Sequence, residues 1–205
     1  QVQCPPRAGH QLDEQQHLVG QPAVRVRQGQ PRGPQANAVG VAVLIGGTGD
    51  DSLDGEAGND VLHGDDGNDW LNGGDGDDDL NGGTGSDTMR GGAGNDIYVV
   101  DASADVVTEN AGEGTDLVQS AVTWTLGANV EDLALTGSSS INGTGNTLSN
   151  ALAGNAAANV LSCSDGNDLA WGAAGNDTLA GGNGNDVLQG GEGNDQLYGD
   201  NGTDA

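Results

Sequence analysis

Six consecutive nine-residue repeats between Gly46 and Val99 constrain the fold of this chain more than any other feature. In register they read GGTGDDSLD, GEAGNDVLH, GDDGNDWLN, GGDGDDDLN, GGTGSDTMR and GGAGNDIYV. The first and fourth positions are always glycine, the sixth is always aspartate, and the eighth is always large and apolar. Internal repeats of fixed length are typical of solenoid proteins, in which each repeat adds one structural unit to a stack.

Each fixed position has a physical reason. Glycine reaches positive φ without penalty, so GGxGx predicts a tight turn whose carbonyl groups can face an ion. The apolar residue two places after the aspartate is expected to point inward from a three-residue strand. Turn, strand, turn and strand make an eighteen-residue coil, so alternate repeats stack on the same side about 4.8 Å apart. Oxygen ligands from two stacked turns suit Ca²⁺, which accepts about six to eight of them.

These repeats resemble the GGxGxDxUx consensus of the hemolysin-type repeats-in-toxin (RTX) family, whose nonapeptides form a calcium-binding β-helix. The resemblance implies an all-β fold, a parallel β-roll or β-solenoid, with Ca²⁺ held between consecutive turns. Three turns per side leave two gaps, so the first array is expected to hold about four ions. Carried over to this chain, the carboxylate ligands are Asp51, Asp69 and Asp87 on one side and Asp60, Asp78 and Asp96 on the other.

Acidic repeats return near the C-terminus as CSDGNDLAW, GAAGNDTLA, GGNGNDVLQ, GGEGNDQLY and the truncated GDNGTDA, in which Asp204 is the sixth-position residue. Cys163 replaces the first glycine and Ala170 replaces the core leucine of the first of these, which weakens the expectation of a site at Asp168. About three further ions are expected in this array. The carboxylate ligands expected here are Asp168, Asp177, Asp186 and Asp195. The glycines whose turn carbonyls are expected to bind metal in the two arrays are Gly49, Gly58, Gly67, Gly76, Gly85, Gly175 and Gly184.

The chain divides by pattern into a first array (41–99), a β-rich spacer with degenerate repeats (100–162) and a second array (163–205). Runs rich in β-branched residues, separated by Gly and Asn, predict short strands at 97–100, 105–108, 117–126 and 133–135. Asn150 and Asn159 stand where aspartate is expected, so their coils should be poor in metal. Asp168 follows Asp96 by a whole number of repeats, which favours one continuous solenoid.

Residues 1–40 differ in kind, with four of the five arginines and all five prolines. Such composition without periodicity predicts a linker or disorder, and a misframed gene start would look the same. No secretory signal peptide is visible. Because the sequence stops at Ala205 inside a repeat, we expect a fragment of a longer protein, with any C-terminal export signal absent. Cys4 and Cys163 are expected to be free thiols.

The formal charge of −26, with no Phe and 39 Gly, lies outside the range of an ordinary globular domain. Such a chain should be disordered alone, because it has little apolar surface to offset ordering entropy and self-repulsion. An acidic disordered tail is the simpler alternative, but it needs no fixed register. About seven bound ions would reduce the charge from −26 to about −12. Nucleic acid is not expected as a partner, because its phosphates would be repelled.

Catalytic motifs are missing from the sequence. There is no HExxH, no GxSxG and, because the chain has no lysine, no GxxxxGK. The apolar run 38–45 is too short to span a bilayer. We therefore expect a non-enzymatic, calcium-dependent folding module of a secreted protein. The resemblance implies a Gram-negative bacterium and export through type I secretion machinery.

Two alternatives stay open. The chain can be the C-terminal fragment of an RTX enzyme (a lipase, protease or polysaccharide epimerase) whose catalytic domain is missing, which the upstream gene sequence would show. It can also be an adhesin or surface-layer protein with a cell-surface or polysaccharide partner, which calcium-dependent cell binding would show.

Overall fold

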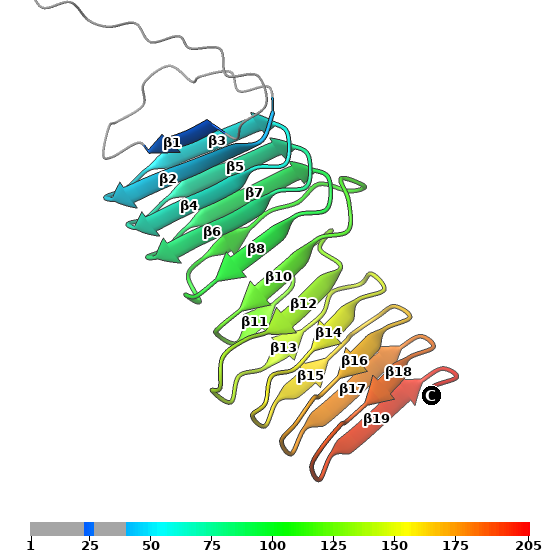
Figure 1. The fold of residues 1–205 in the computed structure, drawn as a ribbon. Helices are drawn as coiled ribbons and strands as arrows, with labels where there is room; N and C mark the ends of the chain where they lie inside the picture. The colour runs from blue at the N-terminus through cyan, green and yellow to red at the C-terminus, as the bar shows by residue number, and fades with distance from the viewer. Residues whose placement is uncertain (1–22, 27–39) are drawn as a thin grey trace, which may run out of the picture.

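The structure is a computed structural model that describes residues 23–26 and 40–205. In the described residues every regular element is a β-strand, and the strands stack in parallel into one elongated column of coils (Figure 1). This confirms the expected all-β parallel solenoid. The prediction that residues 1–40 are disordered falls largely outside the described residues; within that segment, β1 (Ala23–Val26) pairs in parallel with the first solenoid strand.

One sheet of ten strands runs along the whole length of the solenoid. Its strands, in spatial order, are β1, β2 (Ala42–Thr48), β4 (Val61–Asp66), β6 (Asp79–Thr84), β8 (Ile97–Val100), β10 (Leu117–Ser120), β12 (Asp132–Leu135), β14 (Ala151–Ala153), β16 (Leu169–Trp171) and β18 (Val187–Gln189). The expectation of one continuous solenoid is confirmed, because this sheet passes through the spacer. The division at 41–99, 100–162 and 163–205 stays a prediction.

The opposite side of the solenoid consists of two shorter sheets. The first contains β3 (Ser52–Ala57), β5 (Trp70–Asp75), β7 (Thr88–Ala93) and β9 (Val106–Val107). The second contains β11 (Trp124–Thr125), β13 (Gly143–Thr144), β15 (Val160–Ser162), β17 (Thr178–Asn183) and β19 (Gln196–Asn201). The break between β9 and β11 falls in the spacer, where the nonapeptide is lost.

The register follows the sequence period. In both arrays each strand residue pairs with its equivalent two repeats later, as Leu44 does with Leu62. The coils of the spacer have unequal lengths, because Ile97 pairs with Leu117, Leu117 with Asp132, and Asp132 with Ala151. The first of these coils is longer than a regular coil, the second is shorter and the third is slightly longer. The differences cancel, so the second array stacks in phase with the first.

Strand length in the first array differs from the expectation. Strands β3 to β7 have six residues instead of three, because pairing resumes at positions two and three of the next repeat, beyond the position-one glycine. The shorter prediction holds for β14, β15, β16 and β18, each of three residues.

The core is a single column of inward-facing side chains. Position-eight residues of the first array are buried along it, and Leu62, Leu80 and Met89 are fully buried. The expected spacer strand 117–126 divides into β10 and β11 on opposite walls, and Val118 and Leu126 both enter the core.

Two departures from the repeat consensus also lie in the core. Cys163 and Ala170 are both fully buried. Cys163 is a free thiol, as expected, and burial raises its pKa to about 12, so the thiol stays protonated and unreactive. Cys4, the other expected free thiol, lies outside the described residues.

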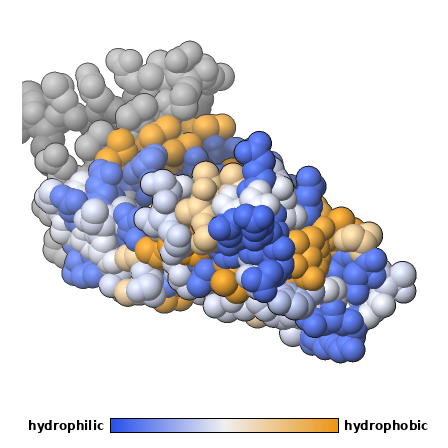
Figure 2. Space-filling model, turned by 90° about the horizontal axis from the view of Figure 1, so that it is seen from below, coloured by the Kyte–Doolittle hydropathy of each residue, from blue (hydrophilic) through white to orange (hydrophobic). Residues whose placement is uncertain are grey.

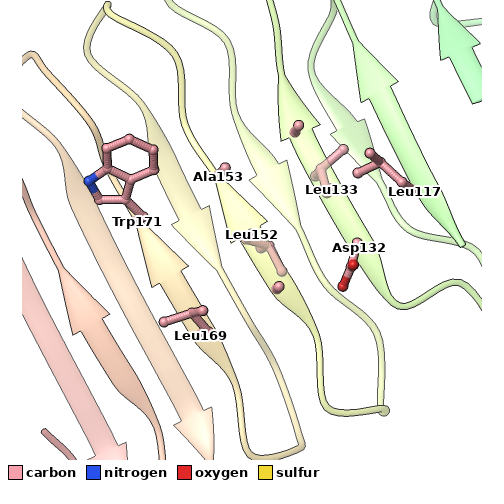
Figure 3. A pocket seen from close by; sticks show the side chains of 9 residues that line it. Leu117, Asp132, Leu133, Leu152, Ala153, Leu169 and Trp171 are labelled. Atoms are coloured by element: carbon pink, nitrogen blue, oxygen red, sulfur yellow. The ribbon is translucent and has the colours of Figure 1, made fainter. Parts of the chain in front are cut away.

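The outer surface is mainly hydrophilic, with separate apolar patches (Figure 2). One patch forms a shallow pocket on the outer face of the ten-stranded sheet, across β10, β12, β14 and β16 (Figure 3). Leu169 and Trp171 are about half exposed there, and Asp132 is the one acidic residue of its lining.

Candidate metal centre

The turns between strands are built on glycines that adopt left-handed backbone conformations. Every position-four glycine expected to bind metal has positive φ, from +106° at Gly49 to +146° at Gly67. A non-glycine residue rarely adopts such angles. A Cβ atom added to Gly67 would also collide with the carbonyl oxygen of Gly49 in the preceding coil. The carbonyl of one position-four glycine therefore points at the backbone of the next turn on the same side.

This arrangement recurs along both arrays. The carbonyls of Gly58, Gly67 and Gly76 point at the equivalent glycines two repeats later, and those of Gly175 and Gly184 do the same in the second array. Gly85 is different, because the chain one coil later enters the spacer and has no glycine turn at the equivalent place.

The position-six aspartates form two ladders inside the turns. The backbone N–H of Asp51 donates to Oδ1 of Asp69 at 2.7 Å, and that of Asp69 donates to Oδ1 of Asp87 at 2.8 Å. On the other side, Asp60 and Asp78 donate in the same way to Asp78 and Asp96, both at 2.7 Å. The six carboxylates therefore align in two rows, as the repeat period predicts, while their role as metal ligands stays a prediction.

The second array repeats the pattern. The backbone N–H groups of Asp168 and Asp177 donate to Oδ1 of Asp186 and Asp195, each at 2.9 Å. Asp168 is 2% exposed despite the irregular repeat around it, and its Oδ1 accepts the N–H of Asn150. Asp195, in contrast, is only partly buried.

The second carboxylate oxygen of these aspartates has no partner. In nine of them Oδ2 is buried and accepts no hydrogen bond from the described residues. Asp51 is 9% exposed and the other eight are 1–2% exposed. These nine are Asp51, Asp60, Asp69, Asp78, Asp87, Asp96, Asp168, Asp177 and Asp186. A buried polar atom without a partner is costly, and a buried charge costs more.

The solenoid contains almost no positive charge to offset these carboxylates. Of the 31 acidic residues, 29 lie within residues 40–205, together with only one arginine, Arg90, and no lysine, so this segment carries a charge of −28. Arg90 binds Glu113 at 3.3 Å on the surface, and its side chain is 45% exposed. Neutralisation must therefore come from protons or from bound cations.

Burial also makes the carboxylates hard to ionise. Desolvation, opposed by the backbone hydrogen bond and reinforced by neighbouring aspartates, raises the pKa of Asp78 to about 7. The same causes raise the pKa of Asp87 and of Asp96 to about 6. Desolvation likewise raises the pKa values of Asp51, Asp60, Asp69, Asp168 and Asp177. A metal ion beside these groups would favour their charged forms.

The position-one glycine leaves room beside each orphaned oxygen. A Cβ atom at Gly46 would lie 2.9 Å from Oδ2 of Asp51, and one at Gly55 would lie 2.5 Å from Oδ2 of Asp60. The available donors are carboxylate and carbonyl oxygens. Hard oxygen donors of this kind suit Ca²⁺ and Mg²⁺ rather than softer metals. The residues present therefore fit a hard divalent cation.

In the degenerate repeats an asparagine amide takes the place of the aspartate carboxylate. Asn150 stands in the aspartate ladder, and its Nδ2 donates to the carbonyls of Val130 and Glu131 at 3.2 and 2.9 Å. Nδ2 of Asn159 donates to the carbonyl of Ile141 at 2.6 Å. The amide nitrogen is a hydrogen-bond donor where the carboxylate has only an acceptor oxygen, and the amide carries no charge that must be neutralised. This is consistent with the expectation that these coils are poor in metal.

Three acidic residues of the spacer join the ladders without having been expected there. Asp105 accepts the N–H of Asp87 at 3.1 Å, and Asp116 accepts that of Asp96 at 2.9 Å. Asp105 follows Asp87 at the regular spacing of two repeats, so the period alone could have identified it. Glu109 likewise follows the position-one Gly91 at the regular spacing and accepts its N–H. Asp116 follows a longer coil, so no regular spacing marks it. In the second array Asp204 extends the ladder by accepting the N–H of Asp186 at 3.1 Å.

The fold and the ladders of buried carboxylates define a β-solenoid protein whose repeated turns are built for hard cations. The family model of the RTX calcium-binding nonapeptide repeat matches in four copies, at residues 40–71, 72–107, 144–179 and 171–205. The chain belongs to this family, and its repeats are calcium-binding repeats of the RTX type. The search for similar curated proteins found no match.

The tight contact between position-four glycines predicts a large effect of a single methyl group. Gly67→Ala should lower the melting temperature in calcium by several degrees, because strain at φ +146° and collision with the Gly49 carbonyl cost at least about 1–3 kcal/mol. Gly137→Ala is the control, since Gly137 also has positive φ (+72°) but open space around its Cβ position. Equal losses in the two variants, measured by thermal circular dichroism, would contradict the close approach of stacked turns.

Proposed function

We propose that this chain is a calcium-dependent folding module of a secreted bacterial protein. The observation that carries the proposal is the set of nine buried aspartate Oδ2 atoms without partners, stacked in ladders with one arginine among 29 acidic residues. A cation bound between turns would supply the missing partner and reduce the repulsion along the stack. The position-six carboxylates and the position-four carbonyls would hold it.

Calcium supplies the driving force for folding in this proposal. An ion that binds only the folded state stabilises it by about 1.4 kcal/mol for each tenfold excess over its Kd. Extracellular calcium modules have Kd values of about 10⁻⁴–10⁻³ M. Several such sites together supply about 5–10 kcal/mol, which is the stability of a whole domain.

The dependence on calcium fits a protein that is exported before it folds. RTX repeats are typical of secreted bacterial proteins. None of the described segments forms a helix of the length and apolar composition needed to cross a bilayer. In the proposal, the chain stays unfolded in the calcium-poor cytosol, passes through type I secretion machinery, and folds outside, where calcium is more concentrated.

We assign no reaction to these residues. The carboxylates occupy equivalent environments along two ladders, whereas a catalytic pair needs two environments that push the pKa values of its members apart. Their one common property is an oxygen that requires a cation, which supports binding rather than catalysis.

A single carboxylate-to-amide substitution tests the proposal. Asp78→Asn keeps the Oδ1 acceptor for the N–H of Asp60 but replaces the orphaned oxygen with an amide nitrogen. We expect one calcium ion fewer per chain and a folding midpoint shifted to about tenfold higher calcium, a change of about 1.4 kcal/mol. Equilibrium dialysis gives the ion count, and circular dichroism during a calcium titration gives the midpoint.

Asp79→Asn is the matched control, because Asp79 is exposed in the same coil and the substitution removes the same charge. It should leave the ion count unchanged and shift the midpoint only slightly. If the two variants behaved alike, the effect would come from net charge, and the ladder carboxylates would not be calcium ligands.

A further inference from the structure

A group of three buried carboxylates lies where the first array meets the spacer. Strand β8 ends the regular repeats, and β10 pairs with it after a coil that is longer than the regular one, with Ile97 opposite Leu117. The chain between them keeps the regular spacing as far as Glu109, which stacks on Gly91, and the extra residues lie between Glu109 and Asp116. One carboxylate oxygen from each of Asp96, Glu109 and Asp116 lies within 4.8 Å of the other two.

All three side chains are shielded from solvent. Asp96 and Asp116 are each 1% exposed, and Glu109 is 5% exposed. Acidic clusters on a protein surface are common and are stabilised by water, but this one has almost no access to it. Three carboxylates at such close range cannot all remain ionised unless a cation lies among them.

The hydrogen bonds of the cluster leave two oxygens without partners. Oε1 of Glu109 accepts the N–H of Gly91 at 3.1 Å and the hydroxyl of Tyr98. Oδ1 of Asp116 accepts the N–H of Asp96 at 2.9 Å. Oε2 of Glu109 and Oδ2 of Asp96 are buried and accept no hydrogen bond from the described residues. A bound cation would be coordinated by these two oxygen atoms.

No arginine or lysine of the solenoid neutralises the cluster. Arg90 is the only arginine within residues 40–205, and it pairs with Glu113 on the surface. Desolvation, followed by repulsion from Asp116, raises the pKa of Glu109 to about 8. Burial and the neighbouring carboxylates both disfavour the charged form of Glu109, and a cation bound among them would offset both effects.

We propose that Asp96, Glu109 and Asp116 bind one hard divalent cation, Ca²⁺, at a junction site distinct from the sites between repeat turns. Glu109 and Asp116 lie outside the matched repeat segments, which end at residue 107 and resume at residue 144. The ion would fasten the irregular segment 109–116 to the last coil of the first array. The inference rests on the proposed function only in the choice of calcium as the ion.

The donor set predicts that this site fills first. Calcium affinity rises with the number of charged ligands and with the rigidity of the site. The junction site has three carboxylates held by backbone hydrogen bonds and a buried tyrosine, whereas a site between two repeat turns has two position-six carboxylates, one from each turn. The first calcium equivalent added to the chain should therefore bind here.

Glu109→Gln tests the inference in the whole chain at saturating calcium. Glutamine keeps the volume and the Oε1 acceptor for Gly91 and Tyr98, but it removes the charged ligand. Equilibrium dialysis should show one ion fewer per chain, with the tightest binding step lost from a calorimetric titration. Glu192→Gln removes the same charge from an exposed residue of the second array and should change neither quantity.

A second measurement covers the case in which Glu109→Gln does not fold. Tb³⁺ replaces Ca²⁺ in oxygen sites and luminesces when an adjacent tyrosine transfers energy to it. Because the Tyr98 hydroxyl contacts Glu109, Tyr98→Phe should abolish most of the tyrosine-sensitised signal from the first Tb³⁺ equivalent. Tyr198→Phe, which changes the exposed tyrosine of β19, should retain it.

The outcomes separate the two proposals. If Glu109→Gln and the wild type bind equal numbers of ions, or if Tyr98→Phe keeps the first Tb³⁺ signal, the cluster holds a proton and the junction site is wrong, while the repeat sites stand. If the wild-type chain binds no calcium, the proposed function fails instead.

Discussion

Removal of calcium with EGTA at neutral pH is expected to abolish the β-sheet circular dichroism signal of this chain, and millimolar calcium is expected to restore it. The solenoid segment carries a charge of −28, and nine of its buried aspartates have an oxygen that no described residue satisfies. Self-repulsion and desolvation therefore oppose folding until cations bind. The change corresponds to about 5–10 kcal/mol, enough to move the chain from unfolded to folded.

Screening of the charges must be separated from specific binding. Sodium chloride at high ionic strength screens exposed charges over about one Debye length but supplies no ligand to a buried oxygen. We expect it to restore little of the signal, and Mg²⁺ to restore less than Ca²⁺, because Mg²⁺ sheds its water reluctantly. A folded signal that survives exhaustive chelation would show that the ladders are stable without metal.

The repeat period alone accounts for most of the fold. A glycine at positions one and four, an aspartate at six and an apolar residue at eight impose a pairing of residues two repeats apart, as seen between Leu53 and Leu71. The rows of aspartates follow from the same period, since stacking coils in register brings equivalent side chains together. The continuous phase from Asp96 to Asp168 likewise anticipated the single ten-stranded sheet.

The conformation of the spacer could not be predicted from the repeat period. Its three coils preserve the total length while each differs from the regular coil, and no local pattern reveals how the difference is distributed. Glu109 stacks at the regular spacing on Gly91, but it stands where the repeat has glycine, so the consensus gives it no role. Asp116 reaches the ladder only after the longer first coil, so its place depends on tertiary contacts. Tyr98 looked like an ordinary apolar residue of the repeat, yet its hydroxyl contacts Glu109 inside the core.

The burial of the aspartates was also not expected from the sequence. The repeat pattern places carboxylates on turns without saying whether they are exposed; the structure covers them, and one oxygen of each accepts a hydrogen bond from the preceding coil. This happens because glycine at position one leaves space for the side chain beneath the turn. In the proposed function, this shielding from water makes cation binding a condition of folding rather than a surface addition.

Acidification without calcium is expected to favour folding, which is the reverse of the usual behaviour of an acidic protein. In the folded state burial raises the pKa of Asp78 to about 7, of Asp87 and Asp96 to about 6, and of Glu109 to about 8. The unfolded values are about 4. The folded chain therefore holds more protons between about pH 4 and 8, and by linkage its stability is full below about pH 4 and lost as the pH rises through about 6 to 8.

In the presence of calcium, the stability of the folded chain is expected to rise with pH, because protons compete with the metal for the same carboxylates. The apparent affinity should fall about tenfold per pH unit for each proton displaced. Thermal circular dichroism between pH 5 and 8, in EGTA and in calcium, measures both slopes and stays above the isoelectric point of about 4.1, where aggregation would interfere. Asp78→Asn, which removes one titrating group, should flatten the EGTA profile near pH 7. Profiles that run parallel in the two buffers would mean that protons and calcium do not share these oxygens, and the buried ladders would then need another source of neutralisation.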